Sequence, residues 1–148
     1  MLKIIAERYS IVREIAQGED GVIYEALDQT DQSRCAVKVF KSKAGSQPDG
    51  VKRFRREVQL GVILGGHDSI VEIRDSGALG SGQLYAIMEL IDGKPLDQWV
   101  ASGVATERAV RVSAEIARAV AFAHDRGVIH RDLKPRNVIV RPWTTWRE

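Results

Sequence analysis

The segment that most constrains the fold is the polar run His130-Arg131-Asp132-Leu133-Lys134-Pro135-Arg136-Asn137. It combines a carboxylate that can accept a proton, a lysine and an amide within a few positions. A long helical pattern precedes the run, and the apolar residues Val138-Ile139-Val140 follow it. We therefore expect a charged loop that joins the end of a helix to a short strand.

The composition is that of a soluble globular protein with one domain or two small lobes. The chain has 148 residues, of which 44% are hydrophobic and 28% charged, and its net charge is +2. This balance gives no reason to expect nucleic acid as a partner. No apolar run approaches the ~18 residues of a membrane span, and no signal-peptide pattern is present. The single cysteine, Cys35, excludes an internal disulfide and favours a cytoplasmic location.

The first part of the chain predicts a β-hairpin with glycines at its tip. The β-branched segment Tyr9–Gln17 and the segment Val22–Leu27 flank the turn Gly18-Glu19-Asp20-Gly21. Backbone N–H groups at such a tip can approach phosphate oxygens because no side chain shields them. An ordinary hairpin turn explains this segment equally well.

A third strand is expected at Cys35–Phe40, and it contains a lysine. Strand alternation places Lys38 on the same face as Ala36 and Phe40. Lys38 either binds a phosphate or is an exposed residue of an edge strand, and this segment alone does not decide between the two interpretations. Cys35 is expected to be a small buried residue.

A helix should follow Pro48-Asp49-Gly50 and end at Gly65-Gly66. Its apolar residues recur at helical spacing, at Val51, Phe54, Val58 and Gly61. Glu57 lies at the rim of this apolar face, where a carboxylate needs a cation partner. Lys38 is one candidate, and Arg53, one turn earlier on the same helix, is the local alternative.

Two further strands, Ile70–Leu79 and Leu84–Leu90, are expected on either side of Gly80-Ser81-Gly82. The remainder predicts a short helix at Leu96–Ala101 and a longer one at Glu107–Arg126. Thr106 is the expected N-cap of the longer helix, and Gly127 its end.

Three segments together resemble protein kinases. Ile15–Ile23 is similar to the glycine-rich loop G-x-G-x-x-G-x-V, with Ala16 at the first glycine and Ile23 at the valine. Lys38 with its neighbours resembles V-A-I-K, and His130–Asn137 matches H-R-D-x-x-x-x-N. From about Tyr9 to Val140 the chain resembles the first half of a bacterial eukaryotic-like (Hanks-type) Ser/Thr protein kinase.

The resemblance implies an α+β, protein-kinase-like fold. Residues 1–91 correspond to the N-lobe, a five-stranded antiparallel sheet with one helix. Residues 92–148 correspond to a partial, helical C-lobe that ends just after the catalytic loop.

The resemblance also implies a site for ATP and Mg²⁺. Asp132 would orient the substrate hydroxyl, Lys134 would neutralise the γ-phosphate, and Lys38 paired with Glu57 would hold the other phosphates. Asn137 would bind the metal. The nucleotide-binding positions carried over from the family are Ile15, Ala16, Gly18, Gly21, Ile23, Ala36, Lys38, Met88, Glu89 and Ile91. His130 is expected to be a packed structural imidazole.

The sequence departs from the family pattern after Asn137. No Asp-Phe-Gly follows, and no aspartate occurs after Asp132. That aspartate is the main Mg²⁺ ligand, and its loss should slow phosphoryl transfer on the order of 10²–10⁴-fold.

Two functions therefore stay open for the chain. One is a Ser/Thr protein kinase that acts on a protein substrate. The other is a truncated pseudokinase that binds a partner protein or forms a homodimer through its exposed partial C-lobe and Trp143 and Trp146. A small-molecule phosphotransferase is less favoured, because Arg131 and Lys134 match the protein-kinase loop.

Overall fold

The computed structural model describes residues 4–43 and 48–142. It divides into two compact units. The first comprises Met1–Gly65 and Val71–Leu90, and the second Gly66–Ile70 and Ile91–Glu148.

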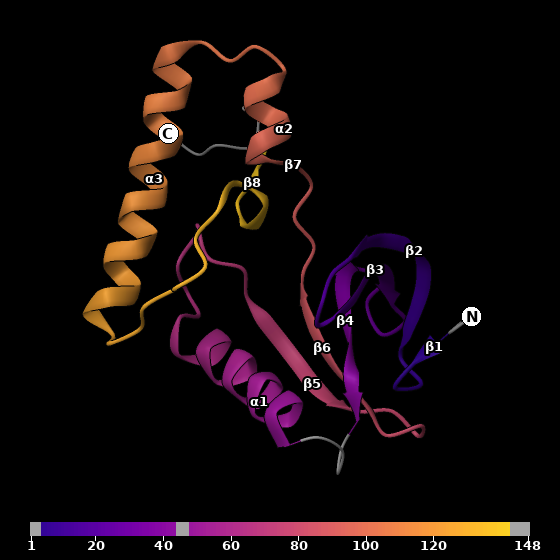
Figure 1. Cartoon of the computed structure of the whole chain (residues 1–148). Coiled ribbons are helices and arrows are strands. Elements are labelled where there is room, and N and C mark those ends of the chain that lie inside the picture. Colours follow the sequence, from indigo (N-terminus) through magenta and orange to yellow (C-terminus); the bar gives the residue numbers. More distant parts are fainter. Residues whose placement is uncertain (1–3, 44–47, 143–148) are drawn as a thin grey trace. The chain divides into compact units, whose positions relative to one another are not determined.

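The first unit is built on an antiparallel sheet of six strands, in the order β1-β2-β3-β4-β6-β5 (Figure 1). The strands are β1 (Ile4–Ile5), β2 (Tyr9–Gln17), β3 (Gly21–Asp28), β4 (Arg34–Lys43), β5 (Ile73–Ala78) and β6 (Gln83–Glu89). Five of them correspond to the expected strands, so the expected count of five is one too low.

The strand missed by the sequence is β1. It has two residues, and these pair with Ser10 and Tyr9 of β2 across a turn at Ala6 and Glu7, where φ is 51° and 55°. A two-residue strand is too short to show an alternating pattern. Its Ile5 is nonetheless completely buried in the core of the sheet.

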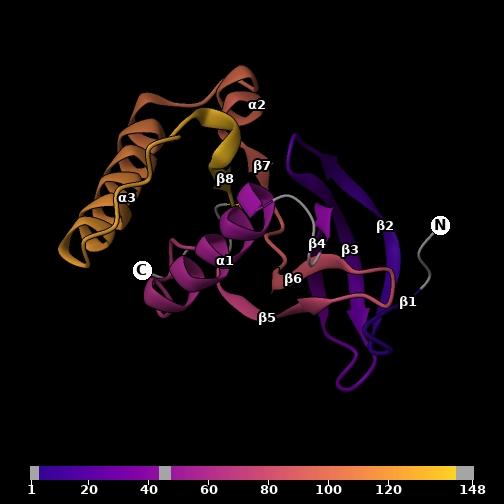
Figure 2. The same cartoon turned by 60° about the horizontal axis from the view of Figure 1, so that its bottom comes forward.

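The two faces of the sheet carry separate apolar clusters. On one face Val37 and Val39 of β4 pack with Tyr85 and Ile87 of β6. On the other face Phe40 packs with Leu84 and Ala86, and helix α1 (Pro48–Ile63) covers this cluster with Val51, Phe54 and Val58. The rings of Phe40 and Phe54 meet edge to face at 5.1 Å between centroids. Figure 2 shows α1 running beside β5, which it contacts.

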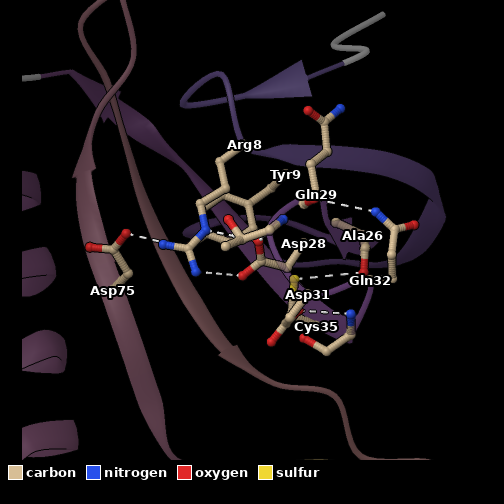
Figure 3. A network of polar contacts seen from close by, with 11 residues as sticks. Arg8, Tyr9, Ala26, Asp28, Gln29, Asp31, Gln32, Cys35 and Asp75 are labelled. Carbon is tan, nitrogen blue, oxygen red and sulfur yellow. Dashed lines mark hydrogen bonds and ion pairs between the residues drawn. The ribbon is translucent and has the colours of Figure 1, made fainter.

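A polar network lies on the face of the sheet opposite α1 (Figure 3). Arg8 binds Asp28 with two hydrogen bonds of 2.8 and 2.6 Å, and this guanidinium holds the Asp28 pKa well below its usual range. The Tyr9 hydroxyl donates to Asp75 at 3.3 Å, and burial raises the Tyr9 pKa to about 12. Cys35 is 1% exposed beneath the network, which confirms it as a small buried residue, and burial raises its pKa.

The second unit contains helices α2 (Leu96–Ala101) and α3 (Thr106–Asp125), the 3-10 turn η1 (Pro135–Asn137) and a small sheet. The sheet pairs β7 (Lys94–Pro95) with β8 (Ile139–Val140). The short helix has the bounds expected from the sequence. The expected cap of the long helix is wrong, because Thr106 is its first residue and Ala105 occupies the cap without a side-chain hydrogen bond.

Helix α3 ends in a motif that directs the chain into the polar run. Gly127 has φ 73°; its N–H donates to the carbonyl of His124, and the N–H of Val128 donates to the carbonyl of Ala123, both at 2.9 Å. These bonds form a Schellman motif. Ala123 and Val128 are both buried, so the helix end is fixed by packing as well as by hydrogen bonds.

Candidate active site

In the first unit, the centre of the candidate site is an ion pair between Lys38 and Glu57. The Nζ atom of Lys38 lies 2.8 Å from both carboxylate oxygens of Glu57. The lysine side chain is 18% exposed and the glutamate 36%. The pair joins β4 to α1, as the family resemblance implies. The local alternative partner, Arg53, binds Asp20 instead.

The strand register explains why Lys38 reaches this position. Ala16, Ile23 and Lys38 are successive neighbours across β2, β3 and β4, and Ala86 of β6 continues the row. Residues directly opposite in a ladder share a face. These side chains therefore lie on the α1 face of the sheet, together with Phe40.

Two more of the expected nucleotide-binding residues, Ala36 and Met88, join this face, and three others are not placed there by the strand register. Ala36 lies opposite Met88, one step along from Lys38 and Ala86. Glu89 lies opposite Cys35, so its side chain belongs to the other face. Ile15 falls at a register shift of β2 and is 41% exposed. Ile91 belongs to the second unit.

The glycine-rich turn closes with a hydrogen bond from the Gly18 N–H to the Gly21 carbonyl, at 2.9 Å. Gly21 has no room for a side chain, because an added Cβ would lie 2.3 Å from the carbonyl oxygen of Val39. The same test at Gly18 meets only one atom, at 4.0 Å. Glycine at position 21 thus lets β3 begin tightly against β4, opposite Phe40 and two residues along from Lys38.

The structure adds contacts around the turn that the sequence reasoning missed. The Lys41 ammonium donates to the Gly18 carbonyl at 3.0 Å, and the Lys41 N–H donates to the Asp20 carbonyl at 2.9 Å. Arg53 of α1 lies 3.4 Å from the Asp20 carboxylate. In the sequence, the Arg53–Asp20 pair is indicated only by the position of Arg53 one helical turn before Glu57.

A second group of charges on the α1 face was also missed. Glu25 is buried on β3, opposite Ala36, and its carboxylate lies 2.7 Å from Arg34 and 2.8 Å from Arg13. The hydrogen bond from Arg34, with help from Arg13, lowers the Glu25 pKa. A charged residue within an alternating strand gives no sign of burial unless its partners on neighbouring strands are known.

In the second unit, the polar run forms a compact hydrogen-bonded loop around Asp132. The Lys134 ammonium lies 2.9 Å from the Asp132 carboxylate. The Asn137 amide nitrogen donates to the Asp132 carbonyl at 2.8 Å and to its carboxylate at 3.2 Å. The run thus brings Asp132, Lys134 and Asn137 together, as expected, and all three are exposed.

The backbone of this loop is strained at one residue. Arg131 has φ 63°, which is uncommon for a residue with a side chain. The turn lets the Asp132 N–H donate to Nδ1 of His130 at 3.2 Å. The expectation of a packed His130 is wrong, because the imidazole is exposed and supports the loop by accepting this hydrogen bond.

The electrostatics of the loop suit a carboxylate that stays ionised. The hydrogen bond from Lys134, followed by the charge of Lys134, lowers the Asp132 pKa. Because the Asn137 nitrogen faces Asp132, the amide oxygen is the atom that can face a cation. The Asn137 amide oxygen is a ligand of the kind that Mg²⁺ prefers. Among the described residues, no group of three or more His, Cys, Asp or Glu side chains could hold a metal.

The Lys38–Glu57 pair and the Asp132 loop both lie within the part of the chain that matches a known family. The protein kinase domain family matches residues 9–145. The chain belongs to the protein kinase family. This confirms the resemblance seen in the sequence and the protein-kinase-like fold.

Several bacterial protein kinases are similar to this kinase chain. The probable serine/threonine-protein kinase PknB of Lactococcus lactis is 38% identical over 141 residues, which cover 93% of the chain and 22% of that protein. The serine/threonine-protein kinase PknA of Mycobacterium tuberculosis is 35% identical over 144 residues, which cover 93% of the chain and 33% of that protein. The chain therefore spans about a fifth to a third of these relatives.

A solved structure matches both units of the kinase fold. The crystal structure of the Mycobacterium tuberculosis PknI kinase domain aligns with a TM-score of 0.75 and 26% sequence identity. The alignment covers 94% of the present chain and 58% of that domain.

Among the described residues, no helix is both long and apolar enough to cross a membrane.

Proposed function

We propose that the chain binds ATP through the first unit and serves phosphoryl transfer to Ser or Thr residues of proteins. The Lys38–Glu57 ion pair carries this proposal. It holds the ammonium group in a fixed place on the face that also presents Ala16, Ile23 and Ala36. The relatives named above as Ser/Thr kinases support the choice of reaction.

The ion pair favours phosphate binding because it reduces the cost of ordering a lysine. A free lysine side chain loses up to about 2 kcal/mol of conformational entropy when it is fixed. Here Glu57 fixes Lys38 before any ligand arrives, and the glycine turn beside it offers backbone N–H groups to phosphate oxygens. The small Ala36 and the apolar Ile23 and Met88 suit the ring of the nucleotide.

The second unit supplies the groups for transfer. Asp132, whose pKa is lowered by the hydrogen bond from Lys134, would accept a hydrogen bond from the substrate hydroxyl and orient it. Lys134 would offset the charge of the transferred phosphoryl group. Bound Mg²⁺ would neutralise phosphate charge, with the Asn137 oxygen as its ligand from this chain.

Titration calorimetry with Mg-ATP tests the binding step. Wild-type chain should bind, and Lys38→Met should weaken binding at least tenfold, because the cation is lost and Glu57 is left unpaired near the phosphates. Lys52→Met is the matched control, since it removes the same charge from an exposed position of α1. Equal binding by all three proteins, or no binding by wild type, contradicts the proposal.

A role as an interaction module is the second candidate. It is favoured by exposed apolar side chains in the second unit, where Val110 is 62% exposed, Ile129 60% and Val100 57%. Trp143 and Trp146, proposed as contacts, lie outside the described residues. Sedimentation tests the homodimer form: concentration-dependent association that Val110→Lys weakens supports it, and a monomer at all concentrations contradicts it.

A further inference from the structure

Helix α1 makes two ion pairs from a single face, one with strand β4 and one with the glycine-rich turn. Arg53 and Glu57 are one helical turn apart and therefore neighbours on that face. They do not bind each other: Glu57 binds Lys38 at 2.8 Å, and Arg53 reaches Asp20 in the glycine-rich turn at 3.4 Å. The helix thus touches both the lysine and the turn that are expected to meet the nucleotide.

The tip of this turn has an unfavourable charge for a phosphate site. Glu19 and Asp20 are its two central residues, between Gly18 and Gly21. A carboxylate at this place repels an incoming phosphate unless a cation neutralises it. Arg53 is the cation that the structure places beside Asp20.

The backbone of the turn is held at the same time. The Lys41 N–H donates to the Asp20 carbonyl, and the Lys41 ammonium donates to the Gly18 carbonyl. These bonds fix where the Asp20 main chain lies on β4. The Asp20 side chain then reaches α1, so the turn is tied to two different elements.

We propose that Arg53 is a positioning residue for the nucleotide: it neutralises Asp20 and ties the glycine-rich turn to the helix that carries Glu57. The proposal rests on ATP binding by the first unit. A movement of α1 that separates Glu57 from Lys38 also separates Arg53 from Asp20. Linkage is reciprocal, so a nucleotide that orders the turn also favours the helix position in which Lys38 is paired.

The expected size of the effect is modest. The side chains of Arg53 and Asp20 are 67% and 49% exposed, and exposed ion pairs contribute little because water and salt screen them. Loss of Arg53, which leaves the Asp20 charge without its cation, should weaken nucleotide binding roughly two- to five-fold at low ionic strength, and less at high salt.

A double-mutant cycle on Mg-ATP affinity tests the inference, with Arg53→Ala, Asp20→Asn and the double variant. Arg53→Ala should weaken binding, because it exposes the Asp20 charge. Asp20→Asn should bind at least as tightly as wild type, and Arg53→Ala should have no further effect in that background. Arg55→Ala is the control, as an exposed arginine on the same helix. An unchanged affinity in Arg53→Ala, or the same loss with and without Asp20, overturns the inference.

Amide hydrogen exchange without nucleotide separates failure of this inference from failure of ATP binding. Arg53→Ala should speed exchange in the turn at residues 18–21 and in the first turns of α1, whereas Arg55→Ala should not. If wild type binds no ATP but exchange responds in this way, the tie stands and the proposed function fails. If exchange does not respond to Arg53→Ala, the tie itself is wrong.

Discussion

At the scale of the residue, Lys38 shows how much of the site depends on strand register. Its neighbours in the row, Ile23 and Ala86, come from strands on either side, and Glu57 comes from a helix over that face. Alternation along one strand was enough to place Lys38 on the correct face. The choice between Glu57 and Arg53 as the paired residue required the register and the helix together.

Gly21 is needed for its small size. Gly21→Ala should lower the free energy of unfolding by about 1–3 kcal/mol, because the new methyl group would collide with the Val39 carbonyl. At this chain length that corresponds to a fall of roughly 2–10 °C in the midpoint of thermal unfolding. Gly18→Ala, in open space, serves as the control; an equal loss in both variants would show that the close approach at Gly21 has no special role.

Glu25 makes the stability of the first unit sensitive to acid. Arg34 and Arg13 lower its folded-state pKa, so its contribution is present above the ordinary glutamate pKa of about 4.3 and is lost as the pH falls through the lower folded value. Glu25→Gln should therefore lower the unfolding temperature at pH 7 and flatten its decline between about pH 5 and pH 3. Thermal unfolding across this range measures both, and an equally steep decline in the variant counts against the pair.

At the scale of the element, the sequence located helices better than short strands. The bounds of α2 and the stop of α3 at Gly127 followed from periodicity and glycine. Strands β1 and β7, of two residues each, exist only because a partner strand lies beside them, so no local pattern reveals them. The expected N-cap at Thr106 was wrong for a similar reason. Which residue caps a helix depends on the direction of the chain before it, and the local pattern does not show that direction.

The end of α3 sets the start of the loop His130–Asn137, and Gly127 fixes that end. Gly127→Ala should cost roughly 1 kcal/mol, because its φ of 73° disfavours any side chain. Gly80→Ala is the matched control, since a Cβ there has nothing within 4 Å. Chemical denaturation compares the two, and a silent Gly127→Ala would show that the Schellman motif does not limit the stability of the helix end.

At the scale of the whole molecule, the residues of the proposed phosphoryl transfer are divided between the two units. The first holds the paired lysine and the glycine-rich turn, and the second holds the Asp132 loop. The order of motifs along the sequence was sufficient to identify the family. The ion pairs of Glu25 and Asp20 could not be predicted from the sequence, because each joins residues that only the folded sheet and helix bring together.

We propose that Lys38 is the lysine that meets the nucleotide phosphates. An acyl phosphate derivative of ATP tests it directly, because a lysine amine beside the phosphates attacks the acyl carbon, forms an amide and releases the nucleotide. Peptide mass spectrometry should find the label on Lys38, with labelling suppressed by excess Mg-ATP. Labelling spread over exposed lysines such as Lys52 and insensitive to Mg-ATP, with Lys38 unmodified, would contradict the claim.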